Sequence, residues 1–235
     1  MRAVLDHIED IALGIKTFWF KPETHPDHNP GQYLRWYLPH ENPDDRGERR
    51  WFTVSASPTE APLISFTTKF AAEKRSSFKT KLLTLKPGET MEFTGPFGDF
   101  VLLKDENIPL IFVAGGIGVT PFRSIIKYLI DSKQKRQIHL LYGANSLEEV
   151  AFRDLLESYE MKFDLILSAP PLGWTGKSGR LDAAKILEII GGFSKQLFYL
   201  SGPEPMIEAL AQDLKTKNVL QTSIVTDFFP GYSDI

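Results

Sequence analysis

The chain contains no cysteine in 235 residues. This absence excludes disulfide bonds, cysteine-ligated zinc and iron–sulfur clusters held by cysteine thiolates. The five histidines are scattered along the chain. The nearest pair, His25 and His28, is accompanied by no further histidine or carboxylate cluster, so we interpret it as part of a solvated loop and expect no metal site.

The sequence also lacks a long apolar run. No stretch approaches the roughly 20 residues that a membrane-spanning helix needs, and the first residues form no signal-like apolar block. We therefore expect a cytoplasmic protein without a membrane span. The net charge of -3 argues against general nucleic-acid binding. The length allows two small domains.

The stretch 110–124 organises the chain. Its apolar start, 110–114, predicts a buried strand of a parallel sheet. Glycines at 115, 116 and 118 then permit a tight turn with close backbone approach. We expect Thr120 to cap the following helix and Pro121 to lie in its first turn. A strand, glycine turn and helix start in this order favour a phosphate-binding site, although a plain tight turn remains the alternative.

The two halves of the chain have different patterns. Short β-rich segments and one helix predict an antiparallel β-barrel at the N-terminus, with strands at 4–12, 15–20, 33–38, 50–58, 63–70 and 91–94 and a helix at 76–85. Alternating strands and helices then predict a parallel α/β sheet, with strands at 110–114, 137–142, 163–168, 196–200 and 223–228 and helices from 120 and at 147–159, 181–190 and 205–215.

Five motifs follow one another in an order that resembles the ferredoxin–NADP reductase family. They are Arg50-x-Phe52-Thr53, Gly95-Pro96-x-Gly98, the glycine stretch 115–121, Tyr142-Gly143-Ala144 and Ser201-Gly202-Pro203-x-x-Met206. The resemblance covers essentially the whole chain. It implies a flavin-binding β-barrel domain at 1–104 and a nucleotide-binding α/β domain for NADH or NADPH at 105–235.

The resemblance assigns a flavin site to the first domain. It implies that Arg50 holds the flavin phosphates, that Phe52 lies against the isoalloxazine ring and that Thr53 hydrogen-bonds near the flavin N5 atom. The amides and hydroxyls at 76–78 suit a pyrophosphate, so FAD is preferred to FMN. The remaining residues expected to bind the flavin are Trp51, Thr67, Lys69, Ser76, Ser77 and Phe78.

The second domain is expected to bind the nicotinamide nucleotide. By the same resemblance its pyrophosphate lies on the glycine turn, and the nicotinamide lies beside Ser201. An acidic residue, Asp227, approaches the active site, and Phe229 covers the flavin. Thr53, Ser201 and Asp227 are thus the expected catalytic residues. No arginine follows Ser168, which favours NADH over NADPH, although Lys177 and Arg180 lie farther on. The residues expected to bind the nucleotide are Gly116, Gly118, Val119, Thr120, Pro121, Tyr142, Ser201, Gly202 and Pro203.

The resemblance implies a flavin-dependent oxidoreductase that passes a hydride from NADH or NADPH to FAD and then electrons to a separate acceptor, such as a ferredoxin or flavodoxin. The alternative is a flavin- or nucleotide-binding electron-transfer subunit or sensor module with little turnover of its own. Because the chain has no cysteine to hold a cluster, the acceptor must be another protein or a small molecule. Residues 69–86 carry a net charge of +5. This segment is either a solvated helix face or a docking patch for an acidic carrier.

Overall fold

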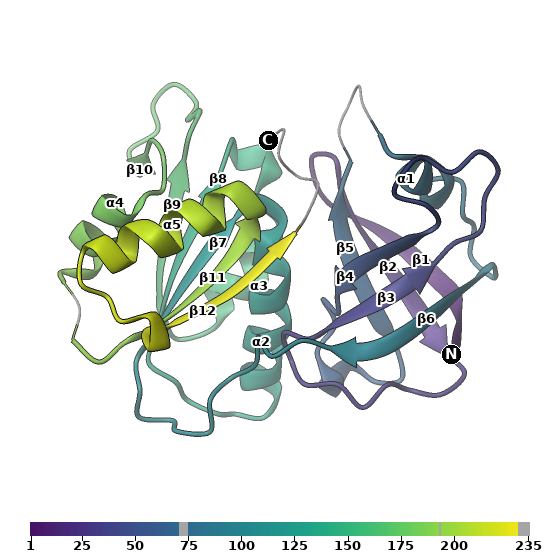
Figure 1. Cartoon of the computed structure of the whole chain (residues 1–235), viewed down its shortest axis with the longest axis horizontal. Helices are drawn as coiled ribbons and strands as arrows, with labels where there is room; N and C mark the ends of the chain where they lie inside the picture. Colours follow the sequence, from purple (N-terminus) through teal and green to yellow (C-terminus); the bar gives the residue numbers. More distant parts are fainter. Residues whose placement is uncertain (71–74, 193, 230–235) are drawn as a thin grey trace.

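The computed structural model describes residues 1–70, 75–192 and 194–229, except for the side chains of 228 and 229. Two six-stranded sheets lie side by side in this part of the chain (Figure 1). The first sheet is antiparallel, and the second is parallel with helices on both faces. The expected order, an antiparallel unit followed by an α/β unit, is confirmed.

The first sheet has the strand order β4-β3-β6-β1-β2-β5. Its two edge strands approach each other where the Ser55 amide donates to the Ser65 carbonyl at 2.9 Å. Large apolar side chains alternate inward, among them Phe20, Trp36 and Phe66, and they fill the interior. The elements are β1 (Arg2–Ala12), β2 (Ile15–Pro22), β3 (Tyr33–Tyr37), β4 (Arg49–Thr53), η1 (Pro58–Glu60), β5 (Ile64–Lys69), α1 (Ser77–Leu82) and β6 (Thr90–Phe97).

The second sheet has the strand order β10-β9-β8-β7-β11-β12. Successive residues of β7 point to opposite faces, so Phe112 packs with the α2 side and Val113 with the α4 and α5 side. The elements are β7 (Leu110–Gly115), η2 (Gly116–Val119), α2 (Thr120–Asp131), β8 (Ile138–Ala144), η3 (Leu147–Glu149), α3 (Arg153–Ser158), β9 (Lys162–Leu167), β10 (Lys177–Ser178), α4 (Ala183–Ile190), β11 (Leu197–Pro203), α5 (Glu204–Thr216), η4 (Gln221–Ser223) and β12 (Ile224–Phe229).

The prediction of one helix over 147–159 is wrong. The segment divides into η3 and α3, and Phe152 between them has a left-handed backbone with φ of 60°. The division has a tertiary cause, because the Ala151 amide donates to the buried hydroxyl of Tyr142 at 3.2 Å. Strand β6 also differs from its expected range, since it runs through Gly95 and Pro96 to Phe97.

Helix α2 joins the two sheets. Arg123 donates to the Ser55 carbonyl at 2.9 Å and pairs with both carboxylate oxygens of Glu60. The next residue, Ser124, donates to the Ala56 carbonyl at 2.8 Å. A second connection is the ion pair between Lys69 and Glu149 at 3.0 Å. The chain crosses from β6 to β7 within residues 98–109.

No helix in the described ranges has both the length and the apolarity needed to cross a membrane.

The Arg123–Glu60 pair supports a stability prediction. Its side chains are only 10% and 17% exposed. Arg123→Met leaves a shielded carboxylate unpaired, so we expect the free energy of unfolding to fall by about 3 kcal/mol. Lys135→Met is the matched control, because its pair with Glu160 is almost fully exposed and is expected to contribute less than about 1 kcal/mol. Urea unfolding of both variants measures the difference, and equal losses would contradict a joining role for Arg123.

Candidate functional site

The glycine turn lies at the carboxyl end of β7, in the middle of the parallel sheet. Gly116 has φ of 51°, and no atom lies within 4 Å of the position that a Cβ would take. Pro121 lies in the first turn of α2, as predicted. The prediction that Thr120 caps this helix is wrong, because its hydroxyl donates to the Ile117 carbonyl at 3.1 Å and Val119 occupies the N-cap position. The turn is therefore a short 3-10 helix that continues into α2.

Two glycines bring the ends of β7 and β11 into backbone contact. A Cβ on Gly118 would lie 2.2 Å from the Ser201 carbonyl oxygen, and one on Gly202 would lie 3.2 Å from the Gly115 Cα. Only glycine permits the approach at Gly118, since real Cβ contacts are never this short. The predicted nicotinamide segment and the predicted pyrophosphate turn thus touch in the fold.

The three residues expected to be catalytic share an unusual feature. Each has a buried polar atom with no hydrogen-bond partner in the described part of the chain: Thr53 Oγ1, Ser201 Oγ and Asp227 Oδ2. Ser201 and Asp227 are partners across β11 and β12. Thr53 lies across from Tyr33, which also pairs with Phe97, two residues before Asp99. Buried polar atoms are rarely left unpaired, and such groups mark a place where a ligand can supply the partner.

The environment of Asp227 changes its acidity. Burial and the negative charge of Asp99 raise the pKa of the Asp227 carboxyl to about 7. Desolvation and a like charge both disfavour the ionised form. Asp227 can therefore hold or release a proton near neutral pH.

The residues predicted to hold the flavin phosphates have an internal partner. Arg50 is buried and donates through Nη2 to Asp44 Oδ1 at 3.0 Å, and Asp44 Oδ2 accepts from the Ser77 amide at 2.8 Å. Although burial raises it, hydrogen bonds from Ser77 and Arg46 and the charge of Arg50 hold the pKa of Asp44 below its usual value. The cluster is therefore charged at neutral pH.

The two aromatic side chains of β4 point to opposite faces of the sheet. Phe52 points inward and stacks on Phe66 with ring centroids 4.3 Å apart and planes 7° apart. Trp51 points outward, is 48% exposed and meets the rings of Tyr33 and Phe97 edge-on. The structure therefore does not bring Trp51 to the same face as Phe52.

Several other predicted binding residues make internal contacts. Thr67 bonds to the hydroxyls of Thr17 and Ser55, and Ser76 caps α1 by accepting from the Lys79 amide. Phe78 is fully buried below the Arg50 guanidinium. Tyr142 is fully buried, and burial raises its pKa. These side chains have packing and hydrogen-bonding roles that the motifs alone do not reveal.

The basic segment 69–86 uses part of its charge internally. Lys69 pairs with Glu149, and the Lys79 ammonium group donates to the Lys69 carbonyl at 2.6 Å. Lys74, which the docking hypothesis includes, lies outside the described residues. The side chain of Phe229, the expected cover of the flavin, also lies outside them, although its backbone ends β12 beside Pro203.

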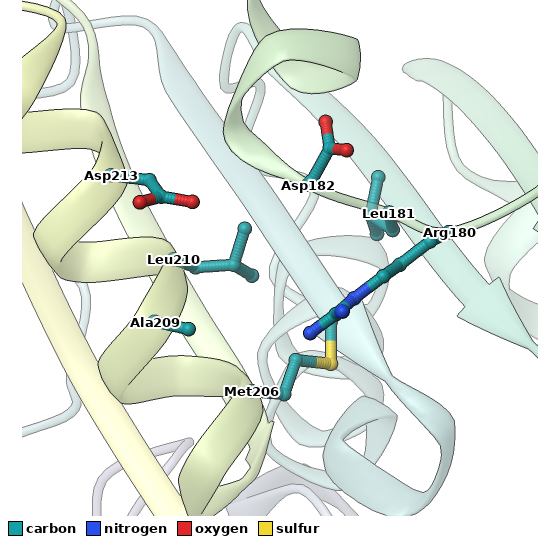
Figure 2. A pocket seen from close by; sticks show the side chains of 7 residues that line it. All are labelled: Arg180, Leu181, Asp182, Met206, Ala209, Leu210 and Asp213. Carbon is teal, nitrogen blue, oxygen red and sulfur yellow. The ribbon is translucent and has the colours of Figure 1, made fainter.

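A cavity of about 200 Å³ lies beside the glycine turn, between α5 and the residues before α4. Figure 2 shows Arg180 extending toward Met206, whose sulfur is the nearest atom to a Cβ placed on Gly115. Asp182 and Asp213 also line the cavity. Lys177 is engaged elsewhere, in an ion pair with Asp164 at 2.7 Å. Of the two cations considered for a 2′-phosphate, only Arg180 faces this cavity.

Sequence reasoning missed two acidic residues of the site. Asp99 directly follows the Gly95-Pro96-x-Gly98 motif, so that motif could have pointed to it. Asp44 lies in a loop expected only to be polar, and its contact with Ser77 spans 33 residues, which no local pattern indicates. In the described ranges, no three histidine or acidic side chains gather where they could hold a metal ion.

The chain is similar in sequence to known proteins. The family model described as "Oxidoreductase NAD-binding domain" matches residues 112–212. The phenol hydroxylase P5 protein of Acinetobacter pittii is 25% identical over 240 residues, which cover 99% of this chain and 66% of that protein. The chain spans 37% to 67% of the lengths of eight curated relatives.

Solved structures share the fold of the whole chain. A cytochrome P450 reductase of Amycolatopsis has a TM-score of 0.83 at 20% identity, over 97% of this chain and 70% of that one. The FAD/NAD-binding domain of a nitric oxide dioxygenase from Vibrio cholerae has a TM-score of 0.81 at 20% identity, over 97% and 98%. This likeness confirms the arrangement of both sheets.

The raised pKa of Asp227 predicts a pH-dependent effect on stability. Between pH 4 and 7 the unfolded chain ionises this residue while the folded chain keeps it protonated, so its contribution lowers stability as the pH rises toward about 7. Asp227→Asn removes this penalty. We expect the variant to gain stability over the unaltered chain above pH 7 and to lose that advantage toward pH 4.

Thermal unfolding between pH 4 and 8 measures this effect. Asp154→Asn, at an exposed position in the first turn of α3, is the control and should show no such trend. A difference for Asp227→Asn that does not vary with pH would contradict the assignment.

Proposed function

We propose that the chain is a member of the ferredoxin–NADP reductase family and that it is a flavin-dependent oxidoreductase, which oxidises NADH or NADPH and passes electrons to a separate acceptor. Residues 1–104 are proposed as the flavin-binding unit and residues 105–235 as the nucleotide-binding unit. The observation that carries the proposal is the set of three unpartnered buried atoms, on Thr53, Ser201 and Asp227.

The ring system of a flavin fits these atoms. An isoalloxazine edge carries both hydrogen-bond donors and acceptors, so it can pair with a hydroxyl and with a carboxyl group. Thr53 comes from the first sheet, and Ser201 and Asp227 come from the second. A ligand held by all three lies at the junction of the two units. When bound, the flavin supplies the chemistry that accepts a hydride and releases electrons singly or in pairs.

The protein's own groups have positioning and proton-holding roles in this proposal. The amides of η2 and the start of α2 receive the pyrophosphate of the nucleotide. The contact of Gly118 with Ser201 sets the nicotinamide segment against that turn. Thr53 donates its hydroxyl toward the ring, and Asp227 holds a proton beside it. The Ser201 hydroxyl has no hydrogen-bond partner among the described residues, so we assign it a role in orienting the nicotinamide and not the role of a nucleophile.

We further propose that NADH is preferred to NADPH. Asp182 and Asp213 line the cavity into which Arg180 extends. Asp182 also caps α4 through the Lys185 amide at 2.9 Å, which fixes its carboxylate. Two carboxylates suit ribose hydroxyls and repel a 2′-phosphate.

The acceptor is proposed to be a separate electron carrier or oxygenase component. The Acinetobacter relative is named for a phenol hydroxylase, and other relatives are electron transfer components of dioxygenases, such as the toluate 1,2-dioxygenase component of Pseudomonas putida. The basic segment supports an acidic carrier less strongly than the sequence suggested, because Lys69 is paired with Glu149. A location in the cytoplasm belongs to the same proposal.

The proposal predicts that Thr53→Val slows reduction of the flavin. The variant keeps the shape of the side chain and removes one hydrogen bond to the ring, so we expect the bound flavin to bleach about tenfold more slowly with NADH while the flavin content is unchanged. Stopped-flow absorbance of the chain reconstituted with FAD measures both quantities. Thr94→Val, at an exposed position of β6, is the control.

Two results would decide against the proposal. A chain that stays colourless after incubation with FAD would overturn flavin binding itself. If the chain turns yellow with FAD but neither NADH nor NADPH bleaches it, the reductase activity is rejected. The alternative, a flavin-binding module without turnover, would then hold.

A further inference from the structure

Asp44 is the centre of a hydrogen-bonded cluster that joins three parts of the first sheet. Its Oδ1 accepts from Arg50 Nη2 at 3.0 Å and from the Arg46 amide at 3.1 Å. Its Oδ2 accepts from the Ser77 amide at 2.8 Å, and its own amide donates to the Ser77 hydroxyl at 2.9 Å. That hydroxyl also lies 2.9 Å from His40 Nε2. Both carboxylate oxygens are therefore used.

The donors around Asp44 are the ones that a phosphate group would use. A guanidinium and main-chain amides bind carboxylate and phosphate oxygens through the same charge-assisted hydrogen bonds. The Arg50 side chain is only 7% exposed. Its Nη1 donates to the carbonyls of Arg46, Gly47 and Arg49. A phosphate can reach Nη2 of Arg50 and the Ser77 amide only if Asp44 leaves, because two anions at one position repel strongly.

We propose that Asp44 determines the flavin specificity of this chain, because its carboxylate occupies the position in which Arg50 and Ser77 would hold a flavin phosphate. The phosphate then adds little to the affinity, and the chain selects its flavin by the ring system. This inference rests on the proposed function, since it requires that a flavin binds at the junction of the two sheets.

The Asp44→Asn variant removes the negative charge of Asp44 and keeps the size of its side chain. The asparagine also keeps one carbonyl oxygen, which can accept a hydrogen bond from Arg50 or from the Ser77 amide. The substitution removes the negative charge that Asp44 places beside the Arg50 guanidinium, so a phosphate at this position is no longer repelled by a carboxylate. Asp45→Asn is the matched control, because it makes the same change at the adjacent, exposed residue.

The experiment compares three flavins that differ in their phosphate groups. The purified chain, freed of flavin, is titrated with riboflavin, FMN and FAD, and binding is followed by isothermal titration calorimetry. For the unaltered chain we expect the three dissociation constants to agree within about threefold. For Asp44→Asn we expect FMN and FAD to bind about tenfold more tightly while riboflavin is unchanged. Asp45→Asn should behave as the unaltered chain does.

Each remaining outcome has a defined meaning. If the unaltered chain binds FMN or FAD more than about threefold more tightly than riboflavin, the inference is overturned, and this comparison needs no variant. It is also overturned if Asp44→Asn binds riboflavin normally but gains no affinity for FMN. In both cases bleaching of the bound flavin by NADH would leave the proposed function intact. If none of the three flavins binds to any of the proteins, the proposed function and the inference fail together.

Discussion

The hydrogen bonds from Arg123 and Ser124 to the carbonyls of Ser55 and Ala56 set the geometry on which the candidate site depends. Helix α2 begins at the end of the glycine turn, so whatever fixes α2 also fixes the turn. Ser55 and Ala56 lie two and three positions after Thr53 on the chain. These two neighbouring side chains of α2 thus help to position the glycine turn relative to the strand that carries Thr53. The Arg123–Glu60 pair adds charge to this connection where solvent is nearly excluded.

The candidate site combines two groups of polar side chains with different surroundings. Thr53, Ser201 and Asp227 each have a buried atom without a hydrogen-bond partner in the described residues. Buried polar atoms without partners lower the stability of the fold, and a bound ligand can supply the missing hydrogen bonds. Around Arg50, the Nη groups of the guanidinium donate to Asp44 and to main-chain carbonyls. Under the proposed function, the first group would bind the flavin ring, whereas Asp44 occupies the position proposed for a flavin phosphate.

Much of the fold could be predicted from the sequence, because periodicity and turn residues are local signals. The strand at 110–114 and the helix ending at Gly191 are examples. The prediction of one helix over 147–159 is wrong because the Ala151 amide donates to the hydroxyl of Tyr142, which lies on β8. The family resemblance pointed to Thr53, Ser201 and Asp227, each of which has a buried atom without a hydrogen-bond partner in the described residues. It could not show that Arg50 donates a hydrogen bond to Asp44. Contacts between distant segments leave no pattern along the chain.

The two partners in the connection between the sheets, the segment at 55–56 and helix α2, should differ in how well they tolerate substitution. On the side of the first sheet the acceptors are main-chain carbonyls of Ser55 and Ala56, which every amino acid carries. On the side of α2 the donors are the side chains of Arg123 and Ser124, which few replacements can reproduce. Substitutions at 55 and 56 that fit the buried space can therefore accumulate without weakening this connection, whereas most changes at Arg123 would weaken it.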